Sequence, residues 1–327
     1  MKTKTILAGI LACTGLTANA QSEQPSEEIN GKAIIQVFTN FHNGFFTHND
    51  DRGFDLDRSY LGYECKFGKE LSIKGVADFG KSSSVDDYQR IAYIKNAMVK
   101  WHHNKFTLSG GLISTTQFGF QEKFWGYRYV RKSFQDEYKF GSSADLGLSF
   151  AFDFNEHFSA DAIIVNGEGY KKLQKKDGLN YGVGATIKPV KGLQARVYGG
   201  INQKTEEGQK STSNFAAFVG YKSEVFSIGT EYNRIWNSSF KEDADLSGMS
   251  FYVDAKVGKK TNIYARFDDL FSKNDWNRAK DESAAILGCQ VKLGKYVKIA
   301  PNVRLNMPKE EEADNVCYAY VNCFFGF

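Results

Sequence analysis

The sequence has 327 residues, of which 15% are aromatic, with 31 glycines but only 4 prolines. Its formal net charge is +4, a near balance that gives no sign of a nucleic-acid partner. After residue 20 there is no run of about 18 consecutive apolar residues, which excludes a membrane-spanning helix from that part of the chain.

Residues 1–20 have the layout of a cleaved secretory signal. Two lysines precede the apolar run Ile6–Ala12, and the small residues Ala18 and Ala20 lie just before Gln21. Removal of this segment would lower the formal charge to +2, because it contains two lysines and no acid. We expect residues 21–31 to form a periplasmic N-terminal segment and residues 32–327 to form the folded part.

The cysteines do not indicate a metal site. Cys13 raises the alternative of a lipoprotein, but Leu11 occupies the place where a small residue is expected. The remaining four fall at apolar positions of the strands described below, and we expect small hydrophobic side chains there rather than disulfides. They are Cys65, Cys289, Cys317 and Cys323.

Strict two-residue alternation predicts β-strands in most of the chain. In residues 145–154, Leu146, Leu148 and Phe150 would share one face, and Asp145 and Ser149 the other. One face is apolar and the opposite face is polar. The same pattern recurs in segments 58–67, 180–188, 193–202, 249–257, 285–293, 297–306 and 317–327.

The connections alternate between short and long. Tight turns are expected at 68–70, 102–105, 155–157, 189–192, 222–224, 258–261 and 294–296, and longer polar links at 44–54, 81–87, 116–142, 167–178, 204–212, 236–245, 272–281 and 307–314. This sorting is typical of an outer-membrane barrel with short periplasmic turns and long extracellular loops. The sequence therefore predicts an all-β fold, a transmembrane antiparallel up-and-down β-barrel of about 16 strands.

Two further features favour a membrane barrel. The chain ends on an alternating strand whose last residue is Phe327, which resembles the terminal recognition strand of such barrels. Aromatic residues also cluster at the tight-turn rim, where an interfacial girdle is expected. This predicted girdle comprises Phe67, Trp101, Phe106, Phe154, Phe158, Tyr221, Phe226 and Tyr296.

One strand fits poorly. Alternation that places Ala97, Val99 and Trp101 outward also turns Lys95 toward lipid, at a cost of about 2 to 4 kcal/mol near the midplane. Either a bulge shifts the register there, or Lys95 lies near the outer interface.

Short motifs across the chain resemble outer-membrane porins related to the phosphate-selective O and P type. They are RSYLG at 58–62, KNAMVKW at 95–101, FTLSGGLI at 106–113, QFGFQEKFWGYRY at 117–129, NGEGY at 166–170 and PNVR at 301–304. The resemblance implies a trimeric porin that contacts outer-membrane lipid and lipopolysaccharide and passes small polar solutes or anions. The basic phosphate path of that family is not assigned to residues here.

The long link 116–142 is expected to fold into the pore. It is rich in aromatic residues, which need a surface to pack against, and the inner barrel wall supplies one. Its charges would form a constriction that sets selectivity, or alternatively pair among themselves and only fix the loop. The candidate constriction residues are Glu122, Lys123, Arg128, Arg131, Lys132, Asp136 and Glu137.

Charged wall residues are also expected to face the lumen. The candidate pore-lining residues are Arg58, Glu64, Lys66, Lys74, Arg196, Glu231, Asp254, Arg266, Asp268 and Arg304, with Asp78, Asp145, Asp161 and Lys298 on the same register. This mixture suits small polar solutes with a slight preference for anions. The lysines of the following long loop form a solvated patch or contact lipid phosphates. They are Lys171, Lys172, Lys175 and Lys176.

No catalytic residue, resident metal or cofactor is predicted. The histidines lie at loops and turns without the spacing of a triad or a metal site. The turn at 258–261 lacks the first glycine and the helix of a phosphate-binding loop. The acids Asp50, Asp51, Asp55 and Asp57 would hold calcium or, in the simpler interpretation, belong to a solvated loop.

The sequence therefore predicts a passive diffusion porin of the Gram-negative outer membrane. A substrate-specific channel for phosphate or another anion would differ by having a saturable site. A surface adhesin or receptor barrel would not conduct. A lipid-active barrel enzyme would need a wall serine and histidine in register, and the sequence supplies no such pair.

Overall fold

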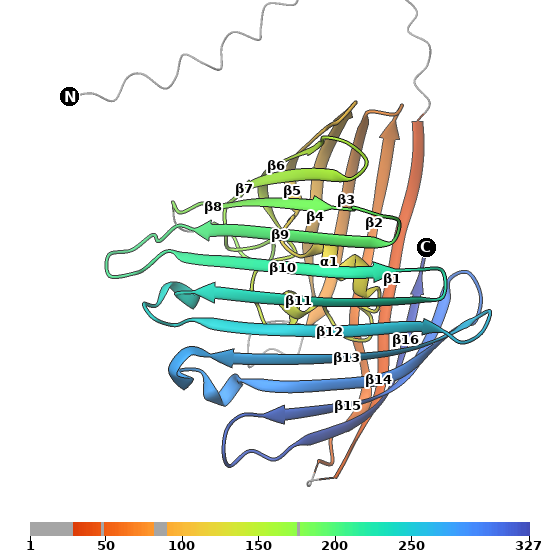
Figure 1. Ribbon diagram of the computed structural model, residues 1–327. Helices are drawn as coiled ribbons and strands as arrows, with labels where there is room; N and C mark the ends of the chain where they lie inside the picture. Colours follow the sequence, from red (N-terminus) through yellow and green to blue (C-terminus); the bar gives the residue numbers. More distant parts are fainter. Residues whose placement is uncertain (1–28, 47–48, 82–89, 175–176) are drawn as a thin grey trace, which may run out of the picture.

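The strands of the protein, seen in a computed structural model, close into one antiparallel barrel (Figure 1). The structure describes residues 29–46, 49–81, 90–174 and 177–327, so the predicted signal segment and Lys175 and Lys176 lie outside the described residues. Within those ranges there are sixteen strands: β1 (Ile29–Phe45), β2 (Arg52–Phe67), β3 (Leu71–Lys81), β4 (Arg90–His103), β5 (Phe106–Ser114), β6 (Ala144–Asp153), β7 (Phe158–Val165), β8 (Asn180–Ile187), β9 (Leu193–Asn202), β10 (Thr212–Lys222), β11 (Phe226–Trp236), β12 (Leu246–Lys256), β13 (Thr261–Ser272), β14 (Glu282–Lys292), β15 (Val297–Pro308) and β16 (Val316–Gly326).

Each strand pairs with its neighbours in the chain, and the sheet closes where the first strand meets the last. β1 pairs with β2 on one side and with β16 on the other, from Gln36 opposite Gly326 to Phe45 opposite Cys317. Closure leaves no free sheet edge. β1 begins at Ile29, inside the predicted N-terminal segment.

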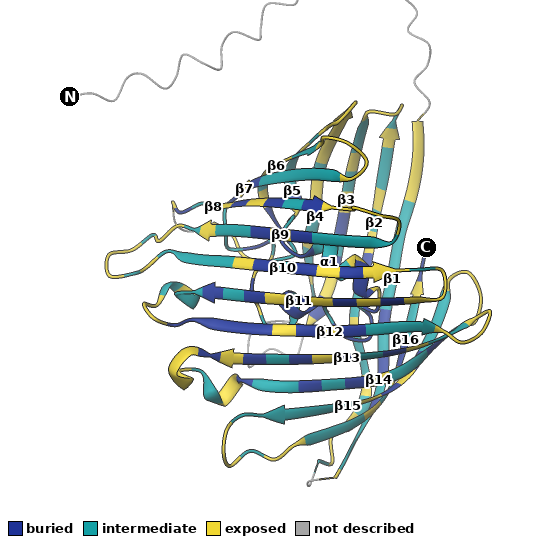
Figure 2. Ribbon diagram, viewed as in Figure 1, coloured by how far each residue is buried: buried dark blue, intermediate teal, exposed yellow. Residues whose placement is uncertain are grey.

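Apolar side chains lie on the outside of the barrel and polar ones on the inside. Along β11 the exposed positions include Phe226, Ile228 and Tyr232, and the positions between them include the buried Ser227 and Glu231 (Figure 2). A water-soluble protein shows the reverse distribution. The predicted barrel and the predicted orientation of its faces are both confirmed.

Aromatic rings pair along the tight-turn rim at the predicted girdle. The ring of Phe154 stacks on that of Phe158 at 4.9 Å between centroids, and the ring of Tyr296 lies 5.8 Å from that of Phe327. These rings contact one another across turns and the chain terminus, so the girdle joins neighbouring strands at that end of the barrel.

A bulge resolves the position of Lys95. The pairing of β3 with β4 shifts register between Val76 and Ala77, so Lys95 has no partner across the ladder. Its Nζ donates hydrogen bonds to the hydroxyl groups of Tyr60 (3.3 Å) and Ser143 (3.0 Å). Lys95 therefore points into the barrel, as the first of the two sequence alternatives requires.

The four cysteines of the described chain, Cys65, Cys289, Cys317 and Cys323, are free thiols. No helix among the described residues is long and apolar enough to cross a bilayer.

Candidate functional site

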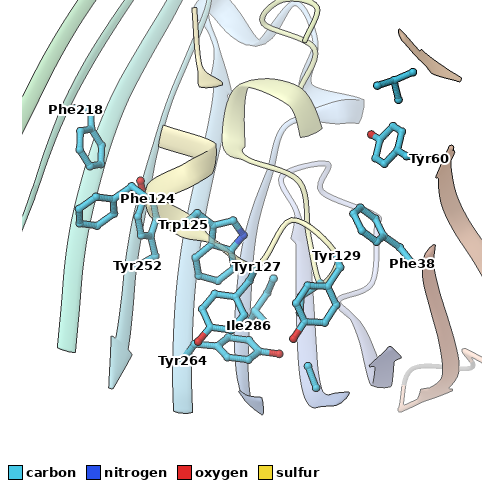
Figure 3. Close-up of a cluster of buried hydrophobic side chains, with 13 residues drawn as sticks. Phe38, Tyr60, Phe124, Trp125, Tyr127, Tyr129, Phe218, Tyr252, Tyr264 and Ile286 are labelled. Carbon is cyan, nitrogen blue, oxygen red and sulfur yellow. The ribbon is translucent and has the colours of Figure 1, made fainter. Parts of the chain in front are cut away.

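The longest connection, residues 115–143, joins β5 to β6 and contacts the inner wall of the barrel (Figure 3). It contains two short helices, α1 (Gly119–Trp125) and α2 (Phe134–Glu137). Gly126 follows α1 as its C-cap, and its φ of 73° lies in the left-handed region that favours glycine. After this residue, Tyr127 and Tyr129 pack against side chains of the wall.

Aromatic side chains of this loop pack on aromatic side chains of the wall. The ring centroid of Trp125 lies 5.5 Å from that of Tyr252, and that of Tyr127 lies 4.3 Å from that of Tyr264 (Figure 3). Phe124 belongs to the same cluster and is 7% exposed. Burial of rings of this size is strongly favourable, so the loop is fixed by a hydrophobic core inside the lumen.

Hydrogen bonds add to this packing. The hydroxyl of Tyr129 donates to Oε1 of Gln290 at 2.8 Å, and the hydroxyl of Tyr127 donates to Asp254. Three arginines of the wall, each on a different strand, donate to carbonyl oxygens of the loop backbone. These bonds join Arg196 to Thr116 (2.8 Å), Arg266 to Lys132 (2.6 Å) and Arg304 to Val130 (2.8 Å).

The loop's own charges are partly paired, which agrees with the second sequence alternative. Arg128 binds Glu122 and Asp136, each at 2.8 Å. Burial works to lower the pKa of Arg128, but its interactions with Tyr60 and with these two carboxylates outweigh burial and raise the pKa above its ordinary value. Lys123, which follows Glu122 in α1, is exposed.

The second arginine of the loop is paired with the wall. Nη2 of Arg131 lies 3.1 Å from Glu282, which also accepts a hydrogen bond from Tyr138 at 2.9 Å. Lys132 lies 4.0 Å from Glu137, at the limit of an ion pair, and its side chain is 41% exposed. Lys132 is thus less tightly paired than Arg128 and Arg131 and is partly open to solvent.

Several residues predicted to line the pore lie beneath the loop instead. Arg266 and Asp268 form a buried pair at 2.8 Å and, like Glu231, are at most 3% exposed. The carboxylate of Asp254 accepts hydrogen bonds from the hydroxyl of Tyr127 and from the side-chain amide of Asn262. The loop covers this part of the wall, so Arg266, Asp268 and Glu231 are shielded from open space and Asp254 binds the loop.

A cavity of about 330 Å³ remains between the loop and the opposite side of the wall. Among the described residues that line it, basic side chains outnumber acidic ones by seven to two. The basic residues are Arg58, Lys81, Arg128, Arg131, Lys132, Lys171 and Arg304, and the acidic ones are Asp57 and Glu137. An excess of positive charge in a confined space attracts anions.

A second cavity of about 590 Å³ adjoins the first and shares Arg58, Lys132 and Lys171 with it. Tyr170 fixes this junction, because its hydroxyl donates to Asp78 at 2.5 Å and accepts a hydrogen bond from Arg58 at 3.1 Å. The next long loop, between β7 and β8, therefore also reaches the wall of β2 and β3.

Lys171 was not among the predicted site residues. It is exposed, as expected for a solvated lysine, but its Nζ lies 4.9 Å from the ring centroid of Tyr93 and faces both cavities. Burial lowers the pKa of Lys171, and the neighbouring Arg58 adds to this effect. The sequence offered one signal, since Tyr170 and Lys171 directly follow the NGEG segment of the porin-like motifs.

Lysines also occupy inward positions at the tight-turn end of the barrel. Lys298 shares the inner face of β15 with Ala300 and Asn302, and Lys74 is the cross-strand partner of Glu64. The inward lysines of this end are Lys66, Lys74, Lys256, Lys292 and Lys298, and none of them lies within ion-pair distance of a carboxylate in the described chain. Within the described residues there is no group of three metal-ligating side chains.

Comparison with known proteins identifies the fold of this chain but not its sequence family. No family model matches the sequence, and no curated protein matches it. Among solved structures, OprB from Pseudomonas putida matches with a TM-score of 0.75 at 10% identity, covering 91% of this chain and 94% of that one. OmpF from Salmonella typhi matches with a TM-score of 0.68 at 9% identity, covering 92% and 98%.

A third solved structure, the anion-selective porin from Comamonas acidovorans, matches with a TM-score of 0.65 at 14% identity and covers 92% of this chain and 100% of that one. At these identities the likeness establishes a porin-type barrel fold. The closer relation to phosphate-selective porins stays a prediction.

Proposed function

We propose that the chain is an outer-membrane porin, a water-filled barrel through which small polar or ionic solutes diffuse without chemical change. Support comes from the closed sheet with an apolar outer face and a polar inner face, because only a closed barrel satisfies its backbone hydrogen bonds in lipid. Further support comes from the solved structures with the same fold, one of which is an anion-selective porin from Comamonas acidovorans.

The loop 115–143 is proposed to narrow the channel and to favour anions. The observation that carries this proposal is the cavity beside the loop, whose lining includes Lys171 and Arg304, two cations with no carboxylate within ion-pair distance in the described chain. The solute would pass between the exposed cations Lys132 and Lys171 and the wall cation Arg58. Selection would follow from size and charge at this point.

Ion selectivity in planar bilayers tests the proposal. With a KCl gradient across the membrane, we expect discrete channel currents and a reversal potential that corresponds to chloride passing more readily than potassium. A channel that prefers potassium would overturn the anion preference. Absence of any current would favour the adhesin or receptor barrel.

Removal of residues 122–139 tests the constriction. We expect the single-channel conductance to rise, because the loop occupies part of the lumen. The substitution Tyr129→Ala is a milder test of the same idea. It removes one aromatic ring of the loop and its hydrogen bond to Gln290 but leaves the chain length intact. Unchanged conductance in both variants would contradict a narrowing role.

A substrate-specific anion channel, as the resemblance to phosphate-selective porins implies, is the second candidate. It is favoured by Arg304, whose guanidinium borders the smaller cavity and has no carboxylate within ion-pair distance in the described chain. Such a channel would show chloride current that millimolar phosphate inhibits in a saturable manner. The trimer and the contact with lipopolysaccharide implied by the same resemblance are testable by cross-linking in isolated outer membranes.

A further inference from the structure

Lysines at the two rims of the barrel differ in how often they have an acidic partner. At the long-loop rim, four lysines are paired with acids, in the pairs Lys81–Asp55 (2.8 Å), Lys210–Glu242 (2.9 Å), Lys273–Asp243 (3.1 Å) and Lys309–Asp269 (2.7 Å). At the tight-turn rim of the described chain, the turn lysines have no carboxylate partner. This group comprises Lys69, Lys105, Lys188, Lys191, Lys259, Lys260 and Lys295.

Two neighbouring turns concentrate this charge. The turn from β12 to β13 contains Lys259 and Lys260, and the turn from β14 to β15 contains Lys295. β13 and β14 are paired, and the backbone N–H of Lys292 donates to the carbonyl oxygen of Lys260 at 2.9 Å, so the two turns lie side by side. We call Lys259, Lys260 and Lys295 the two-turn lysine patch.

No acidic residue of the two turns neutralises the positive charge of the patch. Segments 255–261 and 291–300 contain no acidic residue, and all three lysines of the patch are exposed.

The aromatic girdle places the patch at the depth of lipid headgroups. Nζ of Lys295 lies 5.2 Å from the ring centroid of Tyr296, and the ring of Tyr296 lies 5.8 Å from that of Phe327. Tyrosine and phenylalanine rings of a girdle sit at the membrane interface, and lysine side chains beside them extend to the phosphates.

From these observations we propose that the two-turn lysine patch binds the phosphate groups of anionic phospholipids in the leaflet on the tight-turn side. The inference rests on the proposed membrane location but not on ion selectivity. The partner is a lipid rather than an acidic protein because the charge lies beside the girdle.

Lipid selectivity in vesicles tests the proposal. The protein is reconstituted in phosphatidylcholine with a trace of spin-labelled phosphatidylglycerol or spin-labelled phosphatidylcholine, and the fraction of immobilised label is measured by electron paramagnetic resonance. We expect wild-type protein to immobilise phosphatidylglycerol roughly twofold or more over phosphatidylcholine, and 1 M NaCl to reduce this preference.

Three substitutions in the turns provide the decisive variant. Lys259→Gln, Lys260→Gln and Lys295→Gln together should remove most of the preference. The matched control is Lys210→Gln, Lys273→Gln and Lys309→Gln. It removes the same amount of charge from lysines that are paired with acids, and it should retain the preference for phosphatidylglycerol. Equal loss in both variants, or no loss in the first, would overturn the proposal.

Channel recordings on the same vesicles separate this inference from the proposed function. Both variants should form channels like the wild type. A wild-type protein that inserts and conducts but shows no lipid preference would refute the patch alone, whereas failure to insert or conduct would refute the proposed function.

Discussion

Arg304 on β15 donates a hydrogen bond of 2.8 Å to the carbonyl oxygen of Val130, in a loop that lies 174 residues earlier in the chain. The same guanidinium donates to the side-chain oxygens of Asn302 and Asn322 and lies 3.6 Å from the ring centroid of Tyr320. One wall side chain therefore fixes the loop backbone while the loop's own side chains remain available for other contacts.

Replacement of Arg304 should loosen the loop. In Arg304→Gln the charge-assisted bond to Val130 is lost, at a cost of about 1.5 to 3 kcal/mol. We expect larger open-channel current fluctuations and a changed mean conductance in single-channel recordings. Lys298→Gln is the control, since Lys298 lies on the same face of the same strand and contacts Phe324 but not the loop. Equal fluctuations in the two variants would refute an anchoring role.

The exposed cations of the cavities should set selectivity. Lys132→Gln with Lys171→Gln removes two positive charges that border both cavities, so the preference for chloride over potassium should fall. The reversal potential in a KCl gradient measures this change. Lys210→Gln with Lys273→Gln, which removes two paired rim charges, should leave the reversal potential unchanged.

Tyr170 should stabilise the loop between β7 and β8. In Tyr170→Phe the hydrogen bonds to Asp78 and Arg58 are lost, and Asp78 keeps Arg58 as its partner. We expect a loss of about 1 kcal/mol in the free energy of unfolding, measured by urea titration in vesicles. Tyr181→Phe, at an exposed outer position, should have no such effect, and equal losses would contradict the assignment.

Lysine substitutions at two neighbouring positions of β6 should differ in their cost to stability. Leu148 is 56% exposed on the outer face near the middle of the strand, so Leu148→Lys should cost about 2 to 4 kcal/mol in a bilayer. Ser149→Lys places the same charge in the aqueous lumen and should cost less than about 1 kcal/mol. Similar costs for both variants would show that lipid does not cover the outer face.

The strands and their two faces were predictable because strand geometry has a period of two residues. In β6 the apolar residues Leu146, Leu148 and Phe150 are exposed, as alternation in the sequence requires. Turn lengths then fixed which strands are neighbours, since short connections join antiparallel partners. The closed barrel follows from these local rules.

The details of the candidate site depend on contacts between distant segments, which alternation does not encode. The inward turn of Lys95 requires a bulge between β3 and β4, and its partner Ser143 follows 48 residues later. Alternation placed Arg266 and Arg304 correctly on the inner face. It could not reveal that the loop covers Arg266 while leaving Arg304 at the edge of a cavity.

The three arginines that bind the loop backbone lie on β9, β13 and β15, strands separated around the circumference of the barrel. The loop therefore acts as an internal cross-brace. Any flattening of the barrel into an ellipse would change the spacing of these strands and stretch the bonds to Thr116, Lys132 and Val130. In the proposed membrane location, lateral pressure from the bilayer would be resisted from within the lumen as well as by the sheet itself.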